Sequence, residues 1–274
     1  MNPDKYQKSQ TLSMRDSEQI MSEYMGSMTW KPGERVLDIG CGPGSITAEI
    51  LLPRLPEDIE VLVGADKSSD MLQLASSKYS HPKLEFLQLD LSKEIPADSK
   101  LRILGFDKIF SFYCIHWIYD QRLAISNIYN LLRPGGEALV TIIARTSIIA
   151  AYIAQSKKTE WQSYVKDVEQ TVAPYHHSED PAEDFKIILK DVGFQIVDCK
   201  WKELSFDFVT TSRMKEFVYG INPFISRMPK ELRDIYITDL LMEITKVESK
   251  RSDNKDNKIT EVYHDIIIAY FRKV

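Results

Sequence analysis

Glycines and acidic residues near the start of the chain have the spacing of a nucleotide-binding turn. In Arg35-Val-Leu-Asp-Ile-Gly-Cys-Gly-Pro-Gly44, an apolar run containing Asp38 leads into three alternating glycines. Because glycine lacks a side chain and tolerates left-handed torsion angles, the segment predicts a sharp turn that lets the backbone approach a ligand closely. Asp66 follows 22 residues after Gly44, where doubly wound folds place the acid that binds a ribose diol.

A second group able to do chemistry is the pair His116 and Trp117, within Ser111-Phe-Tyr-Cys-Ile-His-Trp-Ile118. This segment lies at the end of a predicted strand, at the edge where doubly wound sheets bind ligands. The indole ring is apolar apart from its N–H, which donates a single hydrogen bond in a fixed direction and can orient a carboxylate. An imidazole can take a proton from a hydroxyl or amine. The pair therefore predicts an acceptor site, although packing and a hydrogen bond to a carbonyl would also explain it.

Short apolar segments would position these residues. We predict strands at 35–39, 60–66, 84–90, 106–113 and 137–143, with helices between them. The mostly apolar composition is typical of parallel strands buried on both faces. Leu131-Leu-Arg-Pro-Gly-Gly136 predicts a helix end and a turn before the fifth strand, and later strands are predicted at 194–206 and 262–271.

In this order, the segments resemble the motifs of class I S-adenosylmethionine-dependent methyltransferases. The resemblance implies an α/β fold with a Rossmann-like seven-stranded sheet, an antiparallel last strand and a helical cap that binds substrate. It also implies S-adenosylmethionine as cofactor, S-adenosylhomocysteine as product, no metal, and contact between Asp90 and the adenine amino group. The implied cofactor-binding residues are Asp38, Gly40, Cys41, Gly42, Gly44, Asp66, Lys67, Asp90, Leu91 and Ser111.

We interpret the whole chain, 1–274, as a single methyltransferase domain. Residues 30–145 would form the cofactor-binding core. Residues 1–29, 147–191 and 212–257 would form helical cap elements, the second with one interruption around 174–181.

Narrower segments resemble the insect juvenile hormone acid methyltransferases. They are Phe112-Tyr-Cys-Ile-His-Trp-Ile-Tyr-Asp-Gln121, Asn127-Ile-Tyr-Asn-Leu-Leu132, Tyr6-Gln-Lys-Ser-Gln-Thr-Leu-Ser-Met-Arg-Asp16, Ala173-Pro-Tyr-His176 and Ile221-Asn-Pro-Phe224. The similarity thus runs nearly from end to end. It implies transfer of a methyl group to the carboxylate of a sesquiterpenoid, such as farnesoic acid or a juvenile hormone acid.

One position departs from this family. Its members hold the substrate carboxylate with a glutamine of the N-terminal segment and the tryptophan of the His-Trp pair. Alignment places Ser13 at the glutamine position, while Gln10 lies about one helical turn earlier and can present its amide instead. The implied acceptor-site residues are Trp117, His116, Gln10 and Ser13, and the substitution leaves a different acceptor open.

Composition narrows the range of partners. The net charge is −5 and no basic stretch interleaves with aromatic residues, which disfavours a nucleic-acid substrate. Three scattered cysteines suit a reducing compartment. Met1-Asn-Pro-Asp-Lys-Tyr6 has no apolar core of the kind that a signal peptide needs, so we expect none, and no run approaches the ~18 apolar residues of a membrane span. We expect a soluble cytoplasmic protein whose partner is a small apolar acid; a homodimer stays open.

Beside carboxylate methylation, two alternatives stay open and a third is disfavoured. A dehydrogenase is disfavoured, because its fingerprint has a third glycine where this chain has Ser45. A methyltransferase for another acid, a hydroxyl or an amine would differ only in the acceptor site. A non-catalytic relative that binds S-adenosylmethionine would keep the same glycines and acids.

Overall fold

The computed structural model describes residues 3–251 and 260–274, which form two compact units. The larger, the sheet unit, comprises Ser13–Ile142, Ser178–Lys202 and Ile267–Val274. The smaller, the helical unit, comprises the described residues of Met1–Leu12, Ile143–His177 and Glu203–Ile266.

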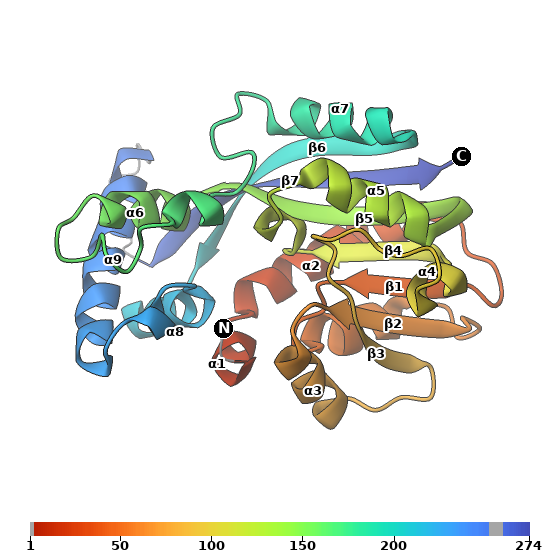
Figure 1. Cartoon of the computed structure of the whole chain (residues 1–274), viewed down its shortest axis with the longest axis horizontal. Helices are drawn as coiled ribbons and strands as arrows, with labels where there is room; N and C mark the ends of the chain where they lie inside the picture. Colours follow the sequence, from red (N-terminus) through yellow and green to blue (C-terminus); the bar gives the residue numbers. More distant parts are fainter. Residues whose placement is uncertain (1–2, 252–259) are drawn as a thin grey trace. The chain divides into compact units, whose positions relative to one another are not determined.

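Seven strands form one mixed sheet in the order β3-β2-β1-β4-β5-β7-β6, and the last strand of the chain runs antiparallel to the central ones (Figure 1). Strands β1 to β5 pair in parallel. The prediction of a Rossmann-like seven-stranded sheet is confirmed. The strands are β1 (Arg35–Ile39), β2 (Val61–Asp66), β3 (Leu84–Gln88), β4 (Phe106–Phe112), β5 (Leu132–Thr146), β6 (Phe194–Asp207) and β7 (Glu261–Lys273).

The central strands are apolar because protein covers both of their faces. Leu37, Leu62, Ile109 and Leu139 are fully buried, as expected of parallel strands. The helices that include sheet-unit residues are α2 (Thr11–Tyr24), α3 (Ser69–Lys78), α4 (Lys100–Leu104), α5 (Gln121–Leu131) and α7 (Pro181–Val192), with the short η1 (Met25–Ser27), η2 (Ile46–Leu51), η3 (Leu52–Arg54) and η4 (Ile115–Trp117).

Polar side chains fix where the helices after the strands begin. Ser68 accepts a hydrogen bond from the main chain at the start of α3, and Asp120 does so at the start of α5. Asp180 caps α7 in the same way. Such caps contribute about 1 kcal/mol each. The segments that carry Asp66 and Trp117 are therefore each followed by a capped helix.

The helical unit contains α1 (Pro3–Lys8), α6 (Ser147–Ser156), α8 (Thr211–Ile221) and α9 (Lys230–Arg251), with the short η5 (Val168–Thr171) and η6 (Ile225–Arg227). α6 packs along α9, and α1 packs against α8. Asp239 of α9 accepts hydrogen bonds from Lys158 at 2.7 Å and from the Trp161 indole at 2.7 Å. These bonds hold the segment that follows α6.

The structure differs from the prediction of helix over residues 147–191. α6 ends at Ser156, residues 157–180 form turns with the short η5, and α7 begins at Pro181. The reason is tertiary, because Lys158 and Trp161 both bond to Asp239 and the Trp161 ring packs edge-on against Tyr236. Residues 252–257 of the last predicted cap element lie outside the described residues. The single domain and the substrate-binding cap stay predictions.

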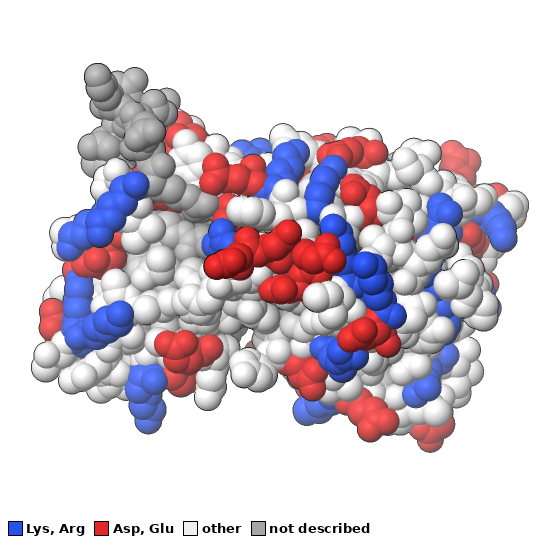
Figure 2. Space-filling model, turned by 90° about the horizontal axis from the view of Figure 1, so that it is seen from above, with Lys and Arg blue, Asp and Glu red and all other residues white. Residues whose placement is uncertain are grey.

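The charged surface carries both signs. Figure 2 shows Lys and Arg interspersed with Asp and Glu on the face that it presents. Within residues 3–251 and 260–274, no helix is both long and apolar enough to cross a membrane.

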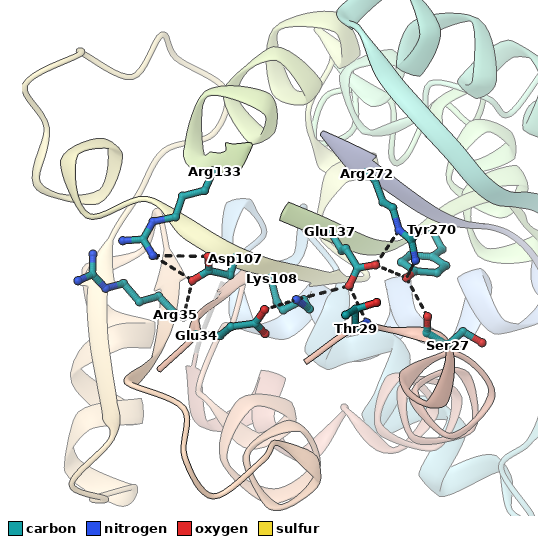
Figure 3. Close-up of polar contacts among 10 residues, drawn as sticks. All are labelled: Ser27, Thr29, Glu34, Arg35, Asp107, Lys108, Arg133, Glu137, Tyr270 and Arg272. Atoms are coloured by element: carbon teal, nitrogen blue, oxygen red, sulfur yellow. Dashed lines mark hydrogen bonds and ion pairs between the residues drawn. The ribbon is translucent and has the colours of Figure 1, made fainter. Parts of the chain in front are cut away.

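A buried ion cluster lies in the sheet unit, near the amino-terminal ends of β1, β4 and β5 (Figure 3). The ammonium group of Lys108 lies 2.8 Å from Glu34 and 3.4 Å from Glu137. Glu137 also accepts hydrogen bonds from the Tyr270 hydroxyl at 2.5 Å and from Arg272 at 2.7 Å. The chain that follows α2 bonds to the same cluster. This amino-terminal edge of the strands is opposite the edge with the glycine turn. We therefore infer that the ion cluster stabilises the fold and does not bind a ligand.

Candidate functional site

The glycines after β1 form the predicted left-handed turn. The φ angles are +77° at Gly40, +53° at Gly42 and +83° at Gly44, a region that favours glycine. A Cβ atom on Gly40 would lie 2.3 Å from both Cβ and Sγ of Cys114, and one on Gly44 would lie 2.9 Å from the Phe86 ring. Glycine is therefore required at both positions by conformation and by space.

Asp66 at the end of β2 joins this turn to the start of α3. One carboxylate oxygen accepts from the Gly42 N–H at 3.0 Å and the other from the Ser68 N–H at 2.9 Å. The main chain of the glycine turn also donates to the Ala65 carbonyl. These bonds fix the half-buried carboxylate at the carboxyl edge of the sheet, where its remaining lone pairs can accept from a diol.

Asp38 lies within β1 and is only 2% exposed. It accepts a hydrogen bond of 2.6 Å from the Thr47 hydroxyl. Burial raises the pKa of Asp38 to about 7; the nearby Asp66 charge acts in the same direction, and the Thr47 hydrogen bond opposes it. A carboxyl group in this state is stabilised as a carboxylate when a cation comes close.

Asp90 lies just after β3, at the same edge of the sheet. One carboxylate oxygen accepts from the Ser92 N–H at 3.1 Å and hydroxyl at 2.6 Å, and the other lies 3.2 Å from Lys93. The Ser92 hydroxyl, with help from Lys93, holds the pKa of Asp90 below its usual range. The neighbouring Leu91 is buried and Lys67 is exposed. Asp90 is thus an ionised acceptor beside an apolar side chain.

Two predicted cofactor residues already use their side chains within the protein. The fully buried Ser111 donates its hydroxyl hydrogen to the Ile39 carbonyl at 3.0 Å. Cys41 is 4% exposed, and its sulfur lies 3.7 Å from the Gly42 carbonyl oxygen. These side chains support the turn. Among the residues that the structure describes, no group of three or more His, Cys, Asp or Glu is arranged to hold a metal ion.

His116 and Trp117 lie in η4, directly after β4. Gln121 donates hydrogen bonds of 3.0 and 2.6 Å to two carbonyls of this turn. Trp117 is 41% exposed, whereas His116 is 6% exposed, and their ring centres lie 5.0 Å apart. The structure therefore leaves the indole accessible and buries the imidazole.

The buried position of His116 decides its charge. Burial lowers the pKa of His116 to about 3, and its Nδ1 atom has no hydrogen-bond partner in the described part of the chain. The imidazole is therefore neutral at pH 7 and is a poor proton acceptor, since catalytic bases work best with a pKa near the working pH. These properties do not support the predicted role of His116 as a base.

The sequence interpretation missed Tyr113, the residue directly after β4. Its φ angle is +55°, a conformation that costs about 1–3 kcal/mol for a bulky residue. Its hydroxyl donates to Asp16 at 2.6 Å, and its N–H donates to the Thr141 hydroxyl oxygen at 3.2 Å. Asp16 is fully buried and pairs with Arg15 at 2.5 Å. No sequence signal marks the positive φ angle.

The two candidate partners of Trp117 lie in different units. Ser13 is half-buried on α2, in the sheet unit and one helical turn before Asp16. Gln10 is buried just before α2 and belongs to the helical unit. Which of them accompanies Trp117 therefore stays a prediction.

Comparison with known proteins gives consistent matches. Residues 30–185 match the model of a methyltransferase domain family. The chain is 33% identical to a juvenile hormone acid O-methyltransferase of Bombyx mori, over 100% of this chain and 98% of the relative. It is 30% identical to one of Drosophila melanogaster, over 98% and 91%. The solved structure of a methyltransferase candidate from Bacillus halodurans C-125 shares the fold with a TM-score of 0.57 and 17% identity, covering 92% of this chain and 98% of that one.

Proposed function

The chain belongs to the family of the juvenile hormone acid O-methyltransferases, and we propose that it methylates the carboxylate of a sesquiterpenoid acid, such as farnesoic acid or a juvenile hormone acid. The names of two relatives that match nearly the whole chain support this acceptor. S-adenosylmethionine would be the methyl donor and S-adenosylhomocysteine the second product.

The glycine turn and its acids fit this cofactor. A Cβ atom at Gly40 would collide with Cys114, so this left-handed turn at the carboxyl edge of the sheet requires glycine at that position. Asp66 would accept from the ribose diol and Asp90 from the adenine amino group, while the buried Asp38 favours a cationic ligand. When bound, the cofactor supplies a methyl group activated by a positively charged sulfur.

One observation favours a carboxylate over a hydroxyl or amine acceptor. His116, the base predicted for the latter two, is buried and has a pKa of about 3. A hydroxyl or protonated amine must lose a proton before methylation and needs such a base. A carboxylic acid with a pKa of roughly 4–5 is already ionised at pH 7. A site whose histidine is a weak base therefore favours a carboxylate acceptor, which needs no deprotonation.

The protein's task is then to orient the acceptor and to remove water from it. The exposed indole of Trp117 can donate one hydrogen bond to a carboxylate oxygen and shield it with its apolar ring. Ser13 or Gln10 would supply a second donor. Fixing the acceptor oxygen in line with the transferred group is worth several kcal/mol of the barrier, and desolvation makes the carboxylate more reactive.

The test compares a sesquiterpenoid acid with its alcohol, its amine and a short polar acid. We expect a methyl ester from the first and negligible transfer to the others. Trp117→Phe keeps the aromatic plate and removes the N–H, so kcat/KM for the acid should fall about ten- to a hundredfold. Trp201→Phe, at an exposed position of β6, is the matched control and should leave it unchanged. Preferential methylation of the alcohol or amine would contradict the proposal.

A further inference from the structure

We propose that Asp16 and Tyr113 form a positioning pair that holds the turn carrying Trp117 against helix α2, and so keeps the acceptor site in its working geometry. The inference rests on the proposed methylation of a carboxylate. It concerns residues that do not touch the reacting atoms, and both lie within the sheet unit.

The pair is joined by one short, buried hydrogen bond between distant parts of the chain. The Tyr113 hydroxyl donates to an Asp16 oxygen at 2.6 Å across 97 residues of sequence. Asp16 is fully buried and Tyr113 is 8% exposed. Burial, reinforced by the Asp16 charge, raises the pKa of Tyr113 well above its usual range, so the phenol stays a donor at any working pH. The other Asp16 oxygen is held by Arg15 at 2.5 and 2.8 Å.

Tyr113 needs this support because its backbone is strained. A tyrosine with φ +55° persists only where its surroundings hold it. The Thr141 hydroxyl and carbonyl oxygens both accept from its main-chain N–H, at 3.2 and 3.3 Å, and Asp16 accepts from its hydroxyl. Trp117 follows only four residues later, and Gln121 fixes the far side of the turn. Without Asp16, the Tyr113 side chain loses this anchor and the strained backbone is held less firmly on the near side of the turn.

The same bond connects Ser13 and Trp117, the two residues of the sheet unit that are predicted to contact the substrate carboxylate. Ser13 lies three residues before Asp16 on α2, so both occupy one face of the helix. The path from Ser13 to Trp117 therefore runs through one helical turn, the Asp16–Tyr113 bond and a short piece of main chain. Asp66 and Asp90 are held by other neighbours. The pair should thus affect the acceptor more than the cofactor.

Steady-state kinetics of acid methylation test the pair. Tyr113→Phe should lower kcat/KM for the acid about ten- to a hundredfold, with less than a threefold change in the dissociation constant of S-adenosylmethionine. Asp16→Ala should cost about as much, and the double variant no more than either single one, because both remove the same bond. Asp16→Asn should recover most of the rate, since its amide can donate to the phenol while its oxygen accepts from Arg15.

Tyr129→Phe is the matched control, because Tyr129 contributes ring contacts in the same unit and no hydroxyl bond is found for it among the described residues. Additive losses in the double variant, or wild-type kinetics of the Tyr113→Phe enzyme, would contradict the proposed positioning role of the Asp16–Tyr113 hydrogen bond.

A readout independent of activity separates this inference from the proposed function. The chain has four tryptophans, so an NMR spectrum of the indole N–H groups gives four signals, and Trp117→Phe identifies the relevant one. Tyr113→Phe and Asp16→Ala should shift or broaden the Trp117 signal and leave the other three in place, even in a protein that esterifies no acid. An unchanged Trp117 signal in both variants would refute the pair, whereas absence of ester with a shifted signal would refute only the proposed reaction.

Discussion

Replacing Asp38 by asparagine should stabilise the protein at alkaline pH and weaken cofactor binding. Asp38 is 2% exposed, and burial raises its pKa to about 7. In the unfolded chain the same carboxyl has an ordinary pKa of about 3.9. The folded protein therefore binds the proton more tightly than the unfolded chain does. Between these pKa values, the free energy of unfolding must fall as the pH rises.

The size of the effect follows from linkage. Each unit of pKa difference corresponds to about 1.4 kcal/mol, so the buried Asp38 carboxylate costs about 1.5 kcal/mol at pH 5 and about 4 kcal/mol at pH 8. Asparagine does not titrate, and its oxygen can still accept from Thr47. The free energy of unfolding of Asp38→Asn relative to wild type should therefore increase by about 2.5 kcal/mol between pH 5 and pH 8.

Urea unfolding of both proteins at the two pH values measures this difference, because the titrations of all other groups cancel. Titration calorimetry with S-adenosylmethionine at pH 8 should show binding weakened about tenfold or more, since a charge-assisted contact contributes about 1.5–3 kcal/mol. A stability difference that does not change with pH would refute the reasoning about Asp38.

Three further predictions concern His116, Lys108 and Gly40. His116→Gln should reduce the loss of stability on acidification from pH 7.5 to 5 by about 2 kcal/mol. The reason is that His116, with a pKa of about 3, stays neutral in the folded protein, while the imidazole of the unfolded chain gains a proton below about pH 6.5. Equal acid sensitivity of the two proteins in urea unfolding would contradict this prediction. Lys108→Met should cost about 3–5 kcal/mol, because the buried Glu34 loses its cation while the buried Glu137 retains Arg272. A loss below 1 kcal/mol in urea unfolding would show the cluster to be dispensable. Gly40→Ala should abolish measurable binding of S-adenosylmethionine, because the new Cβ atom would lie 2.3 Å from Cys114. The control is Gly135→Ala, which should bind S-adenosylmethionine normally because Gly135 has a similar φ of +78° but no atom within 4 Å of a Cβ. Equal affinities of the two variants by calorimetry would contradict this prediction.

The sheet and the glycine turn could be predicted from the sequence because both are local. Short, mostly apolar segments predict strands, and the glycine spacing from Asp38 to Gly44 predicts a left-handed turn. The three positive φ angles and the parallel strand order agree with that expectation. Similarly, Asp66 could be placed beside the turn because the carboxyl ends of neighbouring parallel strands meet at one edge.

The remaining features depend on contacts between distant residues. Nothing near Tyr113 in the sequence indicates its strained backbone, which exists because Asp16 and Thr141 hold it. The low pKa of His116 likewise follows from burial, which neighbouring residues in the sequence do not determine. The turns over residues 157–180 replace the predicted helix because Asp239, far along the chain, binds Lys158 and Trp161.

The most direct test of the central claim is methyl transfer itself. The purified protein is incubated with S-adenosylmethionine labelled in its methyl group and with farnesoic acid, and the product is identified by mass and by its sensitivity to base. The account predicts a base-labile methyl ester that carries the label, formed in step with S-adenosylhomocysteine. Bound cofactor with no ester from farnesoic acid or juvenile hormone acids, or label found on a hydroxyl or amine, would contradict it.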